Sequence, residues 1–274
     1  MFVVNFTPTG MIPMKESVPS VPVSAIEIIE QVHEAYELGI TMTHLHARDE
    51  AGNPTSEVKY FSPILEGVRK HCADLVICAS LSGRNVTDPV ERSEVLSLKP
   101  DMASLTLSSL NFPQQASINS PSTIEVLAQR ISQYGAKAEL EVFDLGMANY
   151  LHYLIRKGLI EAPFYVNVIL GNIAGAQVDF ADLAALLAKI PGESMVALGG
   201  CGRFQLDAHL MALSAGLGVR VGLEDNVFFD RPRKQVTSNI ELLKRIHQLA
   251  GLTERTIMSP AEFGAKGFYN RFRD

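Results

Sequence analysis

Short apolar runs alternate with amphipathic segments along the whole of this 274-residue chain. Runs of about four to eight residues rich in β-branched side chains are typical of buried strands, and apolar positions that recur roughly every third or fourth residue are typical of helices. The first pattern predicts strands at residues 2–7, 41–46, 75–80, 101–107, 137–143, 164–170, 194–198 and 219–223. The second predicts helices at residues 24–38, 61–71, 88–98, 121–134, 147–157, 180–189, 205–215 and 237–250.

Eight strand–helix units without a break in composition predict an α/β fold, a (β/α)8 TIM barrel that forms a single domain over residues 1–274. Ser24 followed by Glu27 is typical of a capping box at the start of the first helix. The alternative is an open doubly wound sheet, but no G-x-G-x-x-G motif follows the first strand. The aromatic tail at residues 259–274 is expected to dock on the barrel, the alternative being a reach into a neighbouring subunit.

The amino-acid composition limits the kinds of function and cellular location that we expect for this protein. With 47% hydrophobic residues the chain can bury a large core, and a net charge of −6 argues against nucleic-acid binding. No apolar stretch is long enough to span a bilayer, and the first residues lack the pattern of a signal peptide. The three cysteines contain no C-x-x-C pair, so we expect neither a disulfide framework nor a cysteine zinc site, and a cytoplasmic location.

Two histidines stand where the second strand ends. The active site of a barrel of this type lies at the carboxyl ends of its strands. His44 and His46 are two residues apart, and such residues of a strand share a face, so both imidazoles project together. They either bind one divalent metal ion or make ordinary hydrogen bonds. The other histidines fall in predicted helices or at their ends, which favours a single metal at most.

Charged residues accompany the later strands, where an unpaired charge is costly to bury. Any one of them can be an exposed residue at a strand end, but several beside two histidines favour an active site. Glu224 is the expected third ligand, since catalytic zinc commonly takes three protein ligands. Arg220 and Asp225 form either a structural ion pair or a pair tuned for proton transfer. The charged candidates are Glu141, Arg220, Glu224 and Asp225.

Uncharged candidates complete the predicted catalytic face. Their serines form no G-x-S-x-G motif, which argues against a serine hydrolase. The glycine-rich segment 199–203 opens a predicted helix, where backbone N–H groups suit an anion, although such turns are common. Cys201 within it is either a nucleophile or a small residue buried in a turn. The uncharged candidates at the third and fourth strands are Ser80, Ser82, Gly83, Ser104 and Thr106.

The chain resembles the β-keto acid cleavage enzymes in motifs that run in family order: residues 9–10, 44–49, 100–105, 110–112, 139–147 and 219–226. The resemblance implies a zinc-binding (β/α)8 barrel, assembled as a homotetramer, that converts a β-keto acid and acetyl-CoA into acetoacetate and a shortened acyl-CoA. By position it implies His44, His46 and Glu224 as zinc ligands. It also implies Ser80, Glu141, Arg220 and Asp225 as the catalytic group, with Ser104 near the substrate.

One position departs from the family member that cleaves 3-keto-5-aminohexanoate. That enzyme has an acidic residue two positions after its Thr-Gly pair, which meets the substrate's ammonium group, and here the position is Ile12. An apolar side chain cannot compensate an ammonium ion. We therefore expect a neutral, rather apolar β-keto acid, with Glu16 as the nearest carboxylate able to alter that expectation. A single-metal lyase or aldolase that does not use CoA, and a non-catalytic metal-binding barrel, are the other hypotheses.

Overall fold

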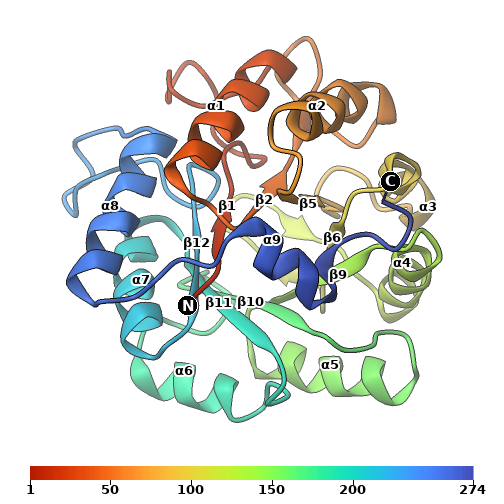
Figure 1. Cartoon of the computed structure of the whole chain (residues 1–274). Helices are drawn as coiled ribbons and strands as arrows, with labels where there is room; N and C mark the ends of the chain where they lie inside the picture. The colour runs from red at the N-terminus through yellow and green to blue at the C-terminus, as the bar shows by residue number, and fades with distance from the viewer. Residues whose placement is uncertain (274) are drawn as a thin grey trace.

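In the computed structural model, which describes residues 1–273, eight parallel strands close into a barrel surrounded by helices (Figure 1). Around the barrel the order is β1, β12, β11, β10, β9, β6, β5 and β2, so only strands that follow one another in the eight-unit repeat are paired. This confirms the predicted single-domain (β/α)8 barrel and excludes the open sheet. The strands are β1 (Val4–Phe6), β2 (Met42–Leu45), β5 (Val76–Ala79), β6 (Met102–Thr106), β9 (Lys137–Val142), β10 (Tyr165–Leu170), β11 (Met195–Gly200) and β12 (Gly218–Val221).

The helices of the outer ring bury their apolar faces against these strands. The Ser24 hydroxyl accepts from the backbone N–H of Glu27, and the Glu27 carboxylate accepts from that of Ser24, which completes the predicted capping box. No described helix is long and apolar enough to cross a membrane. The helices are α1 (Ala25–Leu38), α2 (Val58–His71), α3 (Pro89–Arg92), α4 (Pro121–Gln133), α5 (Leu145–Arg156), α6 (Phe180–Leu187), α7 (Gln205–Ser214) and α8 (Asn239–Leu252), with the short 3-10 helices η1 (Glu94–Leu98) and η2 (Gly202–Phe204).

The helix predicted at residues 88–98 is wrong as one element. It divides at Ser93 into α3 and η1. The Ser93 hydroxyl donates to the carbonyls of Pro89 and Val90, so it competes for acceptors of the helical backbone. The segment then ends at Lys99, whose φ of 52° places it in the left-handed region.

Two small hairpins, which periodicity did not predict, extend the loops at the carboxyl ends of barrel strands. Strands β3 (Ala47–Arg48) and β4 (Pro54–Thr55) pair beyond β2, and β7 (Leu110–Asn111) and β8 (Ala116–Ser117) pair beyond β6. Strands of two residues are too short to leave a periodic signal in the sequence. Both hairpins lie at the end of the barrel where the predicted site residues lie.

The C-terminal segment closes the opposite end of the barrel. In Figure 1 it crosses the middle of the barrel, where α9 (Pro260–Phe263) and the following π-helix η3 (Gly264–Phe268) lie. The rings of Phe263 and Phe268 are stacked, with centroids 4.2 Å apart, and both are fully buried. They pack with the first residues of several strands, namely Met42, Val76, Met102 and Tyr165. The tail thus docks on its own barrel and seals the amino-terminal end.

We predict that Phe263→Ala destabilises the protein by about 3–5 kcal/mol, because it leaves a cavity in this apolar plug. Leu252→Ala is the control: Leu252 is 81% exposed at the end of α8, so its loss is expected to cost about 0.5 kcal/mol or less. Urea unfolding of both variants measures the difference. Equal midpoints for the two variants would show that the plug contributes nothing to stability.

Candidate active site

A cavity of about 780 Å³ opens at the carboxyl end of the barrel. Its floor is made by side chains of the barrel strands and its walls by the loops that follow them, including the β7–β8 hairpin and the loop of Ile12. The structure therefore brings together predicted site residues that are up to 213 positions apart in the sequence, from Ile12 to Asp225. Of the predicted site residues, the cavity is lined by Ile12, His44, His46, Ser80, Ser82, Ser104, Thr106, Glu141, Arg220, Glu224 and Asp225.

The predicted metal ligands converge at the floor. The Nε2 atoms of His44 and His46 are 3.2 Å apart, and Glu224 Oε1 is 3.9 Å and 3.2 Å from them, respectively. Ligand atoms of one tetrahedral metal ion are separated by roughly 3.4 Å when each bond is about 2.1 Å. The second oxygen of Glu224, Oε2, is buried and has no hydrogen-bond partner among the described residues. Two imidazoles and a carboxylate with this spacing fit one divalent transition metal ion.

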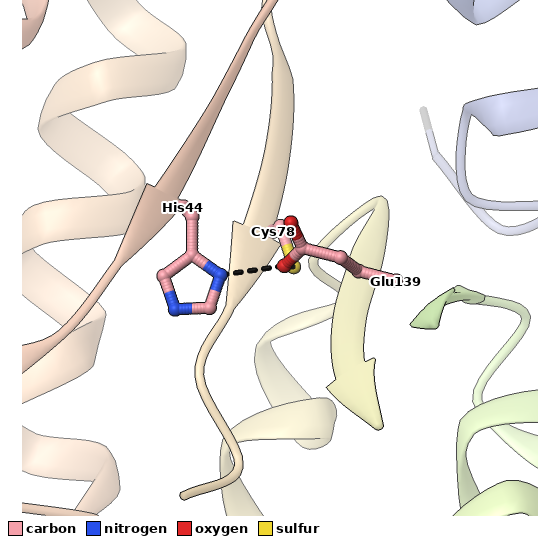
Figure 2. Close-up of side chains that lie close together, drawn as sticks. All are labelled: His44, Cys78 and Glu139. Carbon is pink, nitrogen blue, oxygen red and sulfur yellow. Dashed lines mark hydrogen bonds and ion pairs between the residues drawn. The ribbon is translucent and has the colours of Figure 1, made fainter. Parts of the chain in front are cut away.

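A buried carboxylate orients His44 from the side opposite this cluster. Figure 2 shows the His44 ring turned toward Glu139, with Cys78 beside the carboxylate. Nδ1 of His44 lies 2.5 Å from Glu139 Oε2, and Asn5 Nδ2 and Asn167 Nδ2 donate to Glu139 Oε1 at 2.6 and 3.0 Å. Burial alone would raise the pKa of Glu139, but the nearby His44 and Arg220 outweigh it and lower the pKa. The ionised carboxylate holds the hydrogen on Nδ1, which leaves the Nε2 lone pair of His44 for the metal.

His44, Cys78 and Glu139 are also close enough to one another to be considered as ligands of a second metal. Their atoms are already paired: Cys78 Sγ donates to Glu139 Oε2 at 3.0 Å, and the same oxygen accepts from His44. Burial, followed by the charge of Glu139, raises the pKa of the Cys78 thiol well above its ordinary value. Because a metal needs the thiolate, a thiol that stays protonated is a poor ligand. This cluster is therefore the hydrogen-bonded support of the first site.

Arg220 connects the carboxylates of the floor and is only 2% exposed. Its Nη2 lies 2.7 Å from Glu224 Oε1 and its Nε donates to Asp225 Oδ2 at 2.9 Å. Its Nη1 is 3.8 Å from Glu139 and 3.9 Å from Glu141. Burial opposes the charge of Arg220, but these carboxylates outweigh burial and raise its pKa. The Arg220 guanidinium is thus a permanent cation that is surrounded by four carboxylates and compensates part of their charge.

Two of these carboxylates have raised pKa values, which suits groups that exchange protons. Burial raises the pKa of Asp225, with Arg220 opposing and Glu224 adding to the shift. Burial also raises the pKa of Glu141, with Arg220 again opposing. The Thr106 hydroxyl donates to Glu141 Oε2 at 2.6 Å and fixes its direction. Asp225 and Glu141 are the candidate proton-transfer groups of the cavity.

The uncharged candidates divide into cavity groups and packing groups. Ser80 and Ser82 line the cavity, and the Ser104 hydroxyl accepts from the backbone N–H of Leu81 at 3.0 Å, which ties their loop to β6. Gly83 does not line the cavity. A Cβ atom there would lie 2.6 Å from the carbonyl oxygen of Ile118, so packing explains this glycine. A substrate contact of Gly83 stays a prediction without geometric support.

The glycine-rich segment reaches the cavity through Cys201, Gly202 and Arg203. Burial raises the pKa of the Cys201 thiol to about 12, with the charge of Asp225 adding to the effect. A thiol with so high a pKa is not a nucleophile at neutral pH. The geometry therefore favours the interpretation of Cys201 as a small residue in a tight turn.

Several residues of the site had no role in the sequence analysis. Glu139 shares a strand face with Glu141, and that alternation was the only signal of its buried position. Arg48 is 4% exposed and donates to the carbonyls of Gly10, Pro13 and Gly52, so it holds the loop of Ile12. Arg84 lines the cavity from an irregular loop that follows β5. No spacing rule identifies an arginine in such a loop.

The chain is similar to known proteins along most of its length. A family model described as beta-keto acid cleavage enzyme matches residues 2–266. The chain is 34% identical over 251 residues to the 3-keto-5-aminohexanoate cleavage enzyme of Acetoanaerobium sticklandii, covering 90% of this chain and 91% of that protein. It is 33% identical over 263 residues to the 3-oxoadipate:acetyl-CoA acetyltransferase of Cupriavidus necator, covering 95% and 92%.

Solved structures share the fold. The complex of ObcA with oxaloacetate superimposes with a TM-score of 0.77 at 16% sequence identity, covering 92% of this chain and 68% of that one. The structure of ObcA without ligand superimposes with a TM-score of 0.76 at 17% identity, covering 90% and 65%. At such identities the likeness concerns the barrel alone.

We predict that Glu224→Ala and His46→Ala each abolish stoichiometric metal binding, because each removes one of the three converging ligands. His33→Ala is the matched control, since His33 lies on α1 with its side chain 46% exposed. Purified proteins are loaded with zinc, dialysed and assayed for metal by mass spectrometry. Stoichiometric metal in both ligand variants would refute the assignment.

Glu139→Gln is expected to weaken metal binding by about 10–100-fold, because the neutral amide oxygen is a weaker acceptor than the carboxylate for the hydrogen on His44 Nδ1. Glu125→Gln, on α4 and away from the cavity, is expected to bind metal as the unchanged protein does. Competition with a chromogenic chelator measures both affinities, and thermal unfolding checks that both variants fold. Equal affinities for the two variants would leave Glu139 without an orienting role.

Proposed function

Because the chain belongs to the β-keto acid cleavage enzyme family, we propose that it condenses a β-keto acid with acetyl-CoA and releases acetoacetate and a shortened acyl-CoA. The exchange moves the acetyl group of acetyl-CoA onto the acetate end of the β-keto acid and the remaining acyl group onto CoA. The observation that carries this proposal is the convergence of His44, His46 and Glu224 beside the buried Arg220–Asp225 pair. Relatives named as acetyl-CoA transferases of β-keto acids support it.

We propose zinc as the metal held by His44, His46 and Glu224. The nitrogen and carboxylate donors, their spacing, and the orientation of His44 by Glu139 are the supporting observations. When bound, zinc supplies Lewis acidity toward the keto oxygen of the substrate.

In this proposal Asp225 is the general base. A β-keto acid is acidic at the carbon between its keto and carboxyl groups, and Asp225 would take that proton. Its raised pKa brings it closer to the pH at which a general base works best. Arg220 Nε, 2.9 Å from Asp225 Oδ2, holds the carboxylate toward the cavity. Arg220 would therefore act by orientation and by stabilising negative charge as the carbon is deprotonated.

The remaining polar groups would position the reactants. Ser80 lines the cavity and would donate its hydroxyl hydrogen to the substrate carboxylate or to a developing oxyanion. Glu141, held by Thr106, would orient groups near the metal. Ser104 and Ser82 complete the polar wall. A cavity of about 780 Å³ is within the usual size of a small-molecule site and can admit a β-keto acid with the thioester end of acetyl-CoA.

The acyl chain of the substrate is proposed to be neutral and largely apolar. Ile12 is 47% exposed and lines the cavity, where an ammonium group would need a carboxylate. Glu16, the nearest carboxylate in the sequence, is not in the cavity wall. We therefore propose that 3-keto-5-aminohexanoate, the substrate in the name of one relative, is a poor substrate here.

We also propose a cytoplasmic homotetramer. Apolar side chains such as Ile173 and Phe180, 72% and 76% exposed, offer surface for an interface beside α6. The three cysteines are free thiols, as expected in a reducing compartment.

The test is a panel of β-keto acids of equal length, assayed with and without acetyl-CoA by the formation of acetoacetate. We predict acetoacetate only when acetyl-CoA is present, because the acetyl group enters the product. An ammonium-bearing acid is expected to have a kcat/KM at least about 10-fold below that of its uncharged analogue. Asp225→Asn, which removes the general base without changing size, is expected to lose nearly all turnover.

Two results would contradict the proposal at different points. Cleavage of the acid at the same rate without acetyl-CoA would identify a lyase or aldolase of the same fold. Turnover of the ammonium-bearing acid as fast as its analogue would overturn the proposed substrate charge and leave the reaction intact.

A further inference from the structure

Arg84 places a cation in the cavity wall that the proposed chemistry does not use. It follows Ser80 and Ser82 in the loop after β5 and lines the same cavity as the metal ligands. Its guanidinium carbon lies 3.6 Å from the ring centroid of Phe112. The Phe112 ring meets Phe143, another cavity residue, edge-on at 5.7 Å. Stacking on this aromatic pair fixes where the guanidinium sits.

The other arginines of the wall have protein partners or lie at the exposed mouth. Arg220 is engaged by the carboxylates of the floor, and Arg231 makes a two-point ion pair with Asp207 at 2.6 and 3.1 Å. Arg203 and Arg233 are exposed. Arg84 is partly buried, and within residues 1–273 it has no carboxylate at ion-pairing distance. A partly desolvated cation without a partner is costly, which indicates that a ligand supplies the partner.

The loop that carries Arg84 and the loops that carry the exposed arginines leave the barrel on opposite sides. Strand β2, which carries His44, lies between β1 and β5, so the loops of Ile12 and Arg84 flank the metal ligands on either side. The exposed arginines follow β11 and β12, and β11 is directly across the barrel from β5. If CoA, a long polyanion, binds the exposed arginines, the side of the cavity next to β5 is left for the acyl chain of the β-keto acid.

We propose that Arg84 determines the charge specificity for the acyl chain, which is an inference that rests on the proposed function. A guanidinium only donates hydrogen bonds. It can therefore bind an oxygen acceptor at the far end of the acyl chain, and its positive charge repels an ammonium group there. The position of Ile12 argues only against a cation and alone leaves a neutral, apolar chain; Arg84 changes that expectation at the far end of the chain. The substrate class is therefore a β-keto acid whose chain ends in a carbonyl, hydroxyl or carboxylate oxygen. Exclusion of cations then has two sources, the missing carboxylate at Ile12 and the positive charge of Arg84.

The experiment compares the unchanged protein with Arg84→Met, which keeps an unbranched side chain against Phe112 but removes the charge and the donors. Three β-keto acids of equal length are used, ending in a methyl, a carboxylate or an ammonium group, each at saturating acetyl-CoA. We expect kcat/KM of Arg84→Met to fall about 10-fold or more for the carboxylate acid and to rise for the ammonium acid. For the methyl acid it should change by no more than about threefold.

Arg233→Met is the matched control, because Arg233 also lines the cavity and lies over an aromatic ring, that of Phe228, but is exposed at the mouth. It is expected to keep the original ranking of the three acids. Arg84→Lys, which keeps the charge, is expected to retain discrimination against the ammonium acid.

The outcomes separate the two anionic ligands. A proportional loss for all three acids, with a raised KM for acetyl-CoA, would assign Arg84 to a phosphate of CoA and overturn the proposal. An unchanged ranking with unchanged KM values would also overturn it. If the unchanged protein turns over none of the acids, the proposed function itself fails, which is a result distinct from both.

Discussion

The interaction on which the rest of the site depends is the pairing of buried charge around Arg220. Charges inside a barrel are tolerated only when they are paired or bound to metal. One guanidinium here faces four carboxylates, from Glu139, Glu141, Glu224 and Asp225. Ionised together they would leave an excess of three negative charges, of which a divalent cation offsets two. This excess of negative charge adds to burial in raising the pKa values of Glu141 and Asp225, the two proposed proton-transfer groups.

This charged layer is stable because the barrel separates it from an apolar one. Toward the amino-terminal end, the stacked rings of Phe263 and Phe268 pack on the first residues of the strands and exclude water. Between the two layers, the Glu139 carboxylate accepts hydrogen bonds from Asn5, Asn167 and Cys78. It also contacts Nδ1 of His44 and so fixes the orientation of that ring. The floor is thus built on the barrel strands, while Ile12 and Arg84, which we propose to contact the variable part of the substrate, lie on loops.

Much of the architecture could be predicted from the sequence because each barrel strand and most helices carry their own periodic signal. The split at Ser93 escaped prediction, since a single hydroxyl changed the acceptors available to a helix. The hairpins escaped because pairs of two residues have no period. Among site residues, those at strand ends could be proposed in advance. Arg84 acts from a loop and Arg48 from the two-residue strand β3, and their contacts to Phe112 and to the loop of Ile12 arise only after the chain folds.

By itself the sequence determined the strand–helix alternation, the family, and the placing of two histidines and the later charges at strand ends, because these follow from local periodicity and residue type. Only the tertiary structure decided which charges meet. It put Glu139 behind His44 and Glu224 Oε1 beside two imidazole nitrogens, left Glu224 Oε2 without a hydrogen-bond partner within the described part of the chain, and moved Gly83 out of the cavity. It also set Arg84 in the wall without a carboxylate partner within residues 1–273. Closing the barrel joins strands far apart in sequence, and no local signal records which side chains then lie within hydrogen-bonding distance.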